Sequence, residues 1–201
     1  MSSITYQIGQ SLYLNITNRC TSKCQFCIRY KTKLFNSKHE LWIKKEPTPQ
    51  EVVKEIGDPS KYDEIVFCGY GEPLIRLDAV IEISKWLKEK KAKVRIDTNG
   101  HGNLIHKRNI VPELKGLVDS ISISLNAHNS RTYDKLCRSD FGEAAFDGII
   151  EFARECKKYI PEVEMTVVDI PEVDKKEAEK IADDIGATFR VRPYYEQDYV
   201  K

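Results

Sequence analysis

The sequence predicts an α/β fold with a mainly parallel sheet. Six segments have the apolar periodicity of short β-strands, and amphipathic helical segments fill the intervals between them. Strands that alternate with helices along a chain form parallel sheets. A closed barrel needs eight strands in about 200 to 250 residues, so six strands are too few. An open doubly wound sheet and an incomplete barrel both fit this pattern, and in both the ligands bind beyond the carboxyl ends of the strands.

The predicted strands either alternate apolar and polar residues or are short apolar runs. Residues 12–17 alternate and indicate a half-buried strand, whereas residues 64–68 end at Gly69 and indicate a buried one. The full set covers residues 12–17, 64–68, 93–97, 119–125, 163–169 and 188–191.

Four helices are predicted between these strands. The first begins at Thr48, because Glu51 completes a capping box and Pro49 suits the first turn. The last ends before Gly186, since glycine often follows a helix directly. The helices cover residues 48–56, 78–90, 142–159 and 174–185, and no element is assigned to residues 103–116, which Pro112 interrupts.

The charge balance argues against bulk electrostatic capture of nucleic acid. The 201 residues include 32 basic and 31 acidic ones, a net charge of +1, although a local basic patch remains compatible with this. No apolar run approaches the roughly 18 to 20 residues of a membrane span, and residues 1–10 lack the features of a signal peptide. We therefore expect a cytoplasmic protein with no membrane partner and with reduced cysteines.

Three of the six cysteines lie within eight residues, directly after the first predicted strand. Cys20, Cys24 and Cys27 form a C-x3-C-x2-C motif. Structural zinc and ordinary iron–sulfur sites usually take four protein ligands. Three thiolates on a [4Fe–4S] cluster leave one iron open, which can bind the amine and carboxylate of S-adenosylmethionine (SAM). A reduced cluster can then cleave SAM to a 5′-deoxyadenosyl radical.

The alternative from the same cysteines is a zinc site with a fourth ligand elsewhere. Cys68, Cys137, His39 or His101 is available for that position. Such a protein would be a non-catalytic, zinc-stabilised binding module that partners a nuclease.

Two motifs together resemble the radical SAM superfamily. The first is the three-cysteine motif, in which the aromatic Phe26 precedes the last cysteine. The second, Gly69-Tyr70-Gly71-Glu72-Pro73, resembles the superfamily's Gly-Gly-Glu-Pro motif with Tyr70 inserted. The resemblance implies that this loop binds the methionine part of SAM, with backbone carbonyls and the Glu72 carboxylate receiving the ammonium group. A plain strand-to-helix turn is the alternative.

A third segment resembles glycyl-radical-enzyme activases and 7-carboxy-7-deazaguanine synthases, namely Asp97-Thr98-Asn99-Gly100. Those relatives use the ends of their later strands for the ribose, carboxylate and adenine of SAM. The resemblance therefore implies cofactor contacts at Asp97, Thr98, Asn99, Ser124 and Asn126. Arg192 is a further candidate for the carboxylate.

The chain as a whole resembles the small radical SAM proteins associated with TatD-family nucleases, in residues 12–20, 67–73, 124–127 and 189–192. The resemblance implies an incomplete (βα)6 barrel formed by residues 1–201 as a single domain. It also implies a cluster-binding loop at residues 18–30, an electron donor such as flavodoxin or ferredoxin, and association with such a nuclease. The substrate, a nucleoside or other small molecule or a protein, stays open.

Residues 31–47 mix basic and aromatic side chains. They would form a lid, a surface that stacks on a nucleic-acid base, or a solvated loop that Trp42 fixes to the core. Cys68 and Cys156 are expected in the core, Cys137 in a loop, and His101 and His128 on the surface.

Overall fold

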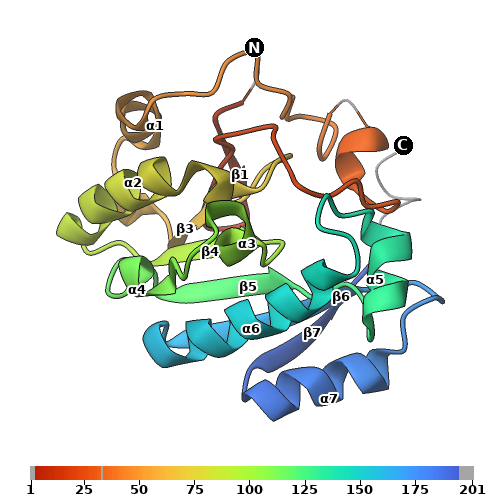
Figure 1. The fold of residues 1–201 in the computed structure, drawn as a ribbon. Helices are drawn as coiled ribbons and strands as arrows, with labels where there is room; N and C mark the ends of the chain where they lie inside the picture. The colour runs from red at the N-terminus through yellow and green to blue at the C-terminus, as the bar shows by residue number, and fades with distance from the viewer. Residues whose placement is uncertain (1–2, 33, 195–201) are drawn as a thin grey trace.

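The computed structural model describes residues 3–32 and 34–194. It contains one seven-stranded sheet whose spatial order follows the chain order (Figure 1). The strands are β1 (Thr5–Ile8), β2 (Ser11–Leu14), β3 (Glu64–Phe67), β4 (Val94–Thr98), β5 (Ser120–Ser124), β6 (Glu162–Val168) and β7 (Thr188–Arg192). All neighbouring pairs from β2 to β7 are parallel, and the sheet does not close. The predicted incomplete barrel is confirmed.

The count of six strands was wrong by one. β1 pairs antiparallel with β2, with Tyr6 opposite Tyr13. The connection is Gly9-Gln10, and Gly9 has a φ of 58°, the left-handed region that glycine favours. The alternation of residues 4–8 and this two-residue glycine turn were a readable hairpin signal.

The four predicted helices are present with boundaries shifted by one or two residues. In residues 3–32 and 34–194 the α-helices are α1 (Pro49–Ile56), α2 (Leu77–Glu89), α3 (Gly102–His106), α4 (Val111–Leu114), α5 (Ser130–Cys137), α6 (Ala144–Tyr159) and α7 (Lys175–Ile185). Three 3-10 turns add η1 (Ile28–Tyr30), η2 (Pro59–Lys61) and η3 (Pro73–Arg76). The predicted capping box of α1 forms between Thr48 and Glu51.

Helix α5 corrects the expected position of Cys137. The residue closes this helix and is buried, instead of lying in a loop. Asn129 caps the helix by accepting a hydrogen bond from the Thr132 amide. The segment has few apolar residues, so its periodicity was weak; tertiary packing of Tyr133 and Leu136 stabilises it.

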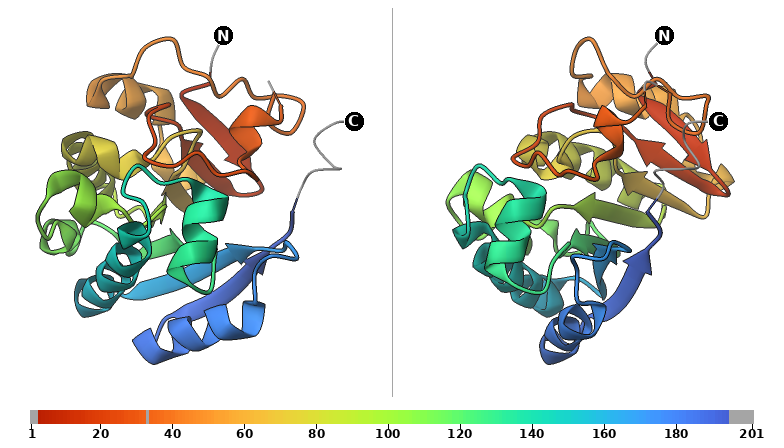
Figure 2. Two further views of the ribbon diagram at one scale, coloured as in Figure 1. Left: turned by 45° about the vertical axis from the view of Figure 1, so that its right-hand side comes forward. Right: turned by 90° about the vertical axis from the view of Figure 1, so that its right-hand side faces the viewer.

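The two faces of the sheet differ in character. Figure 2 shows the helices gathered on one face, where alternate strand residues such as Leu14, Phe67 and Ile96 join the apolar core. The opposite, inner face is polar: Arg95 pairs with Glu64 at 3.1 Å and with Asp97 at 2.9 Å. Charged and polar side chains therefore line this inner face as far as the carboxyl ends of the strands.

No helix in the described part of the chain is long and apolar enough to cross a membrane.

Candidate active site

The cysteine loop leaves the sheet at the end of β2 and turns back along the strand ends. Cys20, Cys24 and Cys27 are all partly exposed, and no cysteine of the chain forms a disulfide. The Cys27 amide donates a hydrogen bond to the Cys24 carbonyl at 3.1 Å. Among residues 3–32 and 34–194, no three histidine, cysteine or acidic side chains converge as a ready-made metal site.

The chemistry of these donors fits an iron–sulfur cluster. Three thiols on one short loop are soft ligands, and the guanidinium groups of Arg29 and Arg192 lie near enough to act on Cys27. Burial raises the pKa of Cys20 to about 12, so the free thiol is protonated at neutral pH. Binding a metal centre there would release protons.

The candidate fourth ligands for zinc are otherwise engaged. The Cys68 thiol contacts Asp97 and Tyr6, and Cys68 is half-buried at the inner face instead of in the core. The Cys137 thiol contacts Cys24. His101 bonds to two hydroxyl groups described below, and the ring of His39 packs on Tyr6.

Arg29 organises the loop from within, and sequence reasoning missed it. Its buried guanidinium donates hydrogen bonds to the carbonyls of Asn18 and Tyr70 at 3.2 Å and of Ser22 at 3.1 Å. It thus joins both ends of the cysteine motif to the Gly69–Pro73 loop. An arginine two residues after the last cysteine was the only signal in the sequence.

The loop is also docked on the end of α5. The Lys23 amide donates to the Cys137 carbonyl at 2.8 Å, and the Gln25 amide donates to the Leu136 carbonyl at 2.9 Å. These bonds satisfy terminal helix carbonyls that have no partner within the helix. Phe26, partly buried, packs against the main core.

The two glycines of the Gly69–Pro73 loop let its backbone lie close to another segment of the same chain. A Cβ on Gly71 would lie 2.4 Å from the Thr17 carbonyl oxygen and 2.5 Å from that of Arg19. A Cβ on Gly69 would lie 2.1 Å from the Asn15 amide oxygen. The glycines therefore let this loop lie directly against the start of the cysteine loop. The predicted approach to SAM is an additional role that no contact here tests.

Glu72 connects this loop with the end of β4. One carboxylate oxygen accepts hydrogen bonds from the Leu74 amide at 3.0 Å and the Thr98 hydroxyl at 2.8 Å; the other accepts from the Asn99 amide at 2.7 Å. Burial outweighs these bonds and raises the pKa of Glu72 to about 7. A carboxylate offers about four lone-pair positions, so the protein already uses most of them.

The inserted Tyr70 points toward residues 31–47, of which Lys33 lies outside the described residues. Its buried ring contacts Trp42 edge-on at a centroid distance of 5.7 Å, and its hydroxyl donates to the Thr32 carbonyl at 3.3 Å. Leu41 is buried in the same small cluster, whereas Trp42 is 40% exposed. Both Leu41 and Trp42 therefore contact this small cluster, with Leu41 as its buried member.

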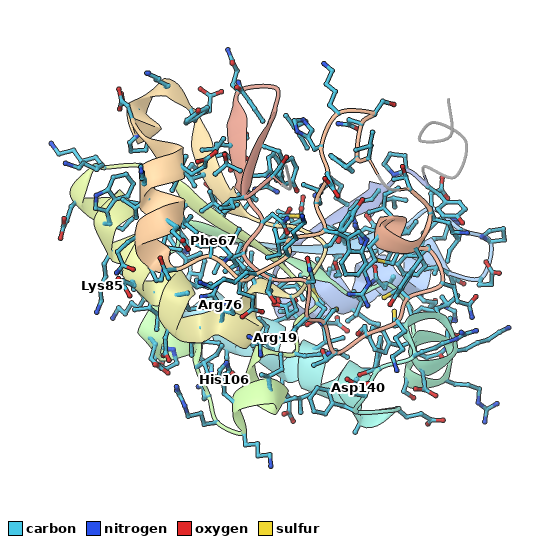
Figure 3. All side chains as sticks on the ribbon, turned by 90° about the horizontal axis from the view of Figure 1, so that it is seen from above. Arg19, Phe67, Arg76, Lys85, His106 and Asp140 are labelled. Carbon is cyan, nitrogen blue, oxygen red and sulfur yellow. The ribbon has the colours of Figure 1, made fainter. Side chains whose placement is uncertain are left out.

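Ion pairs join the end of residues 31–47 to the start of the cysteine loop and to η3. Glu46 pairs with Arg19 at 2.7 Å and with Arg76 at 3.5 Å, and the two arginines are labelled next to each other near the centre of Figure 3.

The predicted contacts at the end of β4 meet the cysteine loop. The Asn99 side-chain amide lies 3.8 Å from the Cys20 sulfur and donates to the Thr21 hydroxyl at 3.0 Å. Asp97 pairs with Arg95 on the inner face, and burial raises its pKa. Asn99, Thr98 and Glu72 thus form one hydrogen-bonded group beside Cys20, while Asp97 lies deeper.

Ser124, Asn126 and Arg192 form a second group on the later strands. The Arg192 guanidinium donates to the Asn126 side-chain oxygen at 3.0 Å and lies 3.4 Å from the Ser124 hydroxyl. Its Nε is buried and has no hydrogen-bond partner among the described residues, and no acidic side chain there forms an ion pair with it. Its hydrogen-bond partners are neutral, and the buried Asp97 carboxyl acts on it through its charge. A partly buried guanidinium with a free Nε is suited to bind an anion.

His101 is fully buried, so its expected place on the surface was wrong. Its Nδ1 lies 2.8 Å from the Thr21 hydroxyl, and its Nε2 lies 2.9 Å from the Tyr133 hydroxyl. The ring therefore links the cysteine loop to α5 through two hydrogen bonds.

We expect His101 to make the protein less stable at mildly acidic pH. Burial lowers the pKa of His101 to about 4, whereas the unfolded chain has a histidine pKa of about 6.5. The unfolded state binds the extra proton first, so stability is lost as the pH falls from about 6.5 to about 4, by roughly 3 kcal/mol. Urea unfolding of wild-type and His101→Gln protein across this range measures the difference.

The comparison between variants is needed because the raised pKa of Glu72 acts in the opposite direction over the same range. His128→Gln, at a half-buried histidine, is the matched control for the loss of one imidazole. An unchanged slope in His101→Gln would contradict the assignment of a neutral, buried imidazole.

Comparisons with known proteins bear on the family and the fold of this chain. The family model described as the Radical SAM superfamily matches residues 14–185. A Methanocaldococcus jannaschii protein, named provisionally as a glycyl-radical enzyme activating enzyme, is 34% identical over 81% of this chain and 63% of its own length. A second protein of that organism, named provisionally as a GTP 3′,8-cyclase, is 29% identical over 70% of this chain and 44% of its own length.

Among solved structures, SuiB of Streptococcus suis bound to its precursor peptide SuiA superposes with a TM-score of 0.69 at 18% identity. That match covers 96% of this chain and 41% of SuiB, and it shows a shared fold. The chain thus spans between two fifths and two thirds of the lengths of these proteins.

Proposed function

The chain belongs to the radical SAM superfamily, whose enzymes use a [4Fe–4S] cluster and SAM, and from this premise we propose that Cys20, Cys24 and Cys27 bind the cluster. The observation that carries the proposal is the meeting of three motif segments at the strand ends. The Asn99 side-chain amide lies beside the Cys20 sulfur and donates a hydrogen bond to the Thr21 hydroxyl. The Glu72 carboxylate accepts a hydrogen bond from the backbone amide of Asn99. When bound, the reduced cluster supplies the electron that cleaves SAM to methionine and a 5′-deoxyadenosyl radical.

The chain's own residues would hold SAM in place for this cleavage. Arg192, supported by Ser124 and Asn126, is placed to bind the carboxylate of the methionine part. The Gly69–Glu72 loop would receive the ammonium group through its backbone carbonyls and the remaining capacity of Glu72. Asp97, Thr98 and Asn99 complete the predicted set of contacts around the cofactor.

The reaction would begin with hydrogen abstraction from a substrate. The similarity to a protein named as a glycyl-radical enzyme activating enzyme favours a protein substrate, and the similarity to a cyclase favours a small molecule. The sheet does not close between β1 and β7, and an open side of this kind suits a large substrate such as a protein. Association with a TatD-family nuclease stays a prediction, and we find no support for a zinc-stabilised binding module.

The direct test is anaerobic reconstitution with iron and sulfide, followed by addition of dithionite and SAM. We expect about four irons and four sulfides per chain, and 5′-deoxyadenosine above a no-protein control. Bound zinc, with no cluster formed, would contradict the proposal and favour the binding module.

Arg192→Gln should weaken SAM binding without removing iron. Loss of hydrogen bonds to a charged group costs about 1.5 to 3 kcal/mol, so the Kd for SAM should rise roughly 10- to 100-fold. Equilibrium dialysis of the reconstituted protein measures this Kd. Arg190→Gln is the matched control on the same strand, because Arg190 already pairs with Glu164. Equal Kd values for Arg192→Gln and wild type would show that another group binds the carboxylate.

A further inference from the structure

The exposed face of α5 is basic. Arg131, Lys135 and Arg138 follow one another at intervals of four and three residues, and all three are exposed. Arg131 and Lys135 lie four residues apart and so share one face of the helix, and Arg138 follows as the residue that caps its end. Tyr133, Leu136 and Cys137 occupy the opposite, buried face.

A fourth cation extends this basic face, defined here as Arg131, Lys135, Arg138 and Lys23. The exposed Lys23 lies at the end of α5, because its amide bonds to the Cys137 carbonyl at 2.8 Å. Two acidic residues lie nearby, the half-buried Asp134 and the exposed Asp140. None of the four cations forms an ion pair in the described part of the chain, unlike Lys175 or Arg190 on the neighbouring elements.

The helix that carries the basic face contacts one of the proposed cluster ligands. Cys24 follows Lys23 in the loop, and its thiol contacts Cys137 of the same helix. The Gln25 amide, next to Cys24, donates to the Leu136 carbonyl of α5 at 2.9 Å. The groups proposed to hold SAM, including Asn99 and Arg192, lie instead at the strand ends. An electron that enters through α5 therefore reaches a cluster ligand without crossing the site where the cofactor and substrate would lie.

We propose that this basic face docks an acidic, one-electron carrier protein that reduces the cluster. The inference rests on the proposed function, because a cluster must be present to receive the electron. The carrier loses one electron and the cluster gains one, and no atom is transferred. Encounters between redox proteins are small and transient, and complementary charge mainly raises their association rate. The face has no exposed aromatic side chain within α5, which argues against RNA, whose bases need stacking partners.

The test uses charge reversal in R131E/K135E/R138E, with an acidic flavodoxin as the probe. Stopped-flow absorbance follows bleaching of the reconstituted cluster by the reduced flavodoxin. We expect the second-order rate at low ionic strength to fall at least about 10-fold and to lose its salt dependence. Reduction by dithionite, a small molecule, should match wild type. The control K85E/K90E/K91E makes the same change of net charge at exposed lysines on and after α2; it should stay near the wild-type rate.

Equal losses in both variants would overturn the proposal in favour of a general charge effect. An unchanged rate in R131E/K135E/R138E would also overturn it. Selective loss of binding to a single-stranded RNA probe, with normal flavodoxin kinetics, would assign the face to nucleic acid. Titration of oxidised flavodoxin into the protein without a cluster tests docking separately. If flavodoxin docks but no cluster assembles, the docking surface is supported and the proposed function is contradicted. If a cluster assembles but flavodoxin does not dock, the proposed function is supported and the docking surface is contradicted.

Discussion

Cys24→Ala should lower the iron content of reconstituted protein from about four atoms per chain to fewer than one. Each of three cysteines would hold one iron of the cluster, and two thiolates on a loop of eight residues leave half of the irons without a protein ligand. Formation of 5′-deoxyadenosine should fall to the level of the no-protein control. Iron and sulfide analysis and chromatography of the SAM products measure the two effects.

Cys156→Ala is the matched control, because Cys156 is fully buried in α6 and contributes only packing. It should lower the unfolding free energy slightly and keep the iron. Retention of cluster and activity in Cys24→Ala would refute the assignment of this ligand. The Cys137 thiol, which contacts Cys24, would then be the first replacement to examine, through the double variant Cys24→Ala with Cys137→Ala.

Gly71→Ala should destabilise the whole strand-end region. The added methyl group would lie 2.4 and 2.5 Å from two backbone carbonyl oxygens, and backbone cannot rotate away as a side chain can. Overpacking in a filled site costs about 1 to 3 kcal/mol, and the upper part of this range applies here. For a chain of this size the Tm should fall by roughly 6 to 12 °C. Calorimetry measures the loss, and SAM affinity should fall with it.

Gly148→Ala provides the comparison. Its new methyl group would lie 2.7 Å from the end of the Leu104 side chain, which can change rotamer. Alanine also favours the helical backbone of α6 over glycine by about 1 kcal/mol. The two effects oppose each other, so the Tm should change by only a few degrees. Equal Tm values for the Gly71 and Gly148 variants would show that the loop tolerates separation from the cysteine loop.

The sequence by itself determined the class of fold, the family and the main motif segments. Strand periodicity, the capping box of α1 and the C-x3-C-x2-C spacing are local properties, so they can be read without knowing what the chain packs against. The open parallel sheet then follows from the alternation of elements. Local signals were insufficient for α5, because its polar sequence is helical only when Tyr133 and Leu136 pack on the core.

Only the tertiary structure decided what each motif residue contacts. Arg29 and Tyr70, Glu72 and Asn99, and Thr21 and His101 are separated by 41, 27 and 80 positions. Their contacts depend on the register of parallel strands and on the close approach that Gly71 permits. Burial then sets their chemistry: it makes His101 a neutral link and Glu72 a bridge between strands. Residue type and spacing indicate which face of an element is buried, but they do not show which distant side chains meet there, because those contacts arise from how the elements pack.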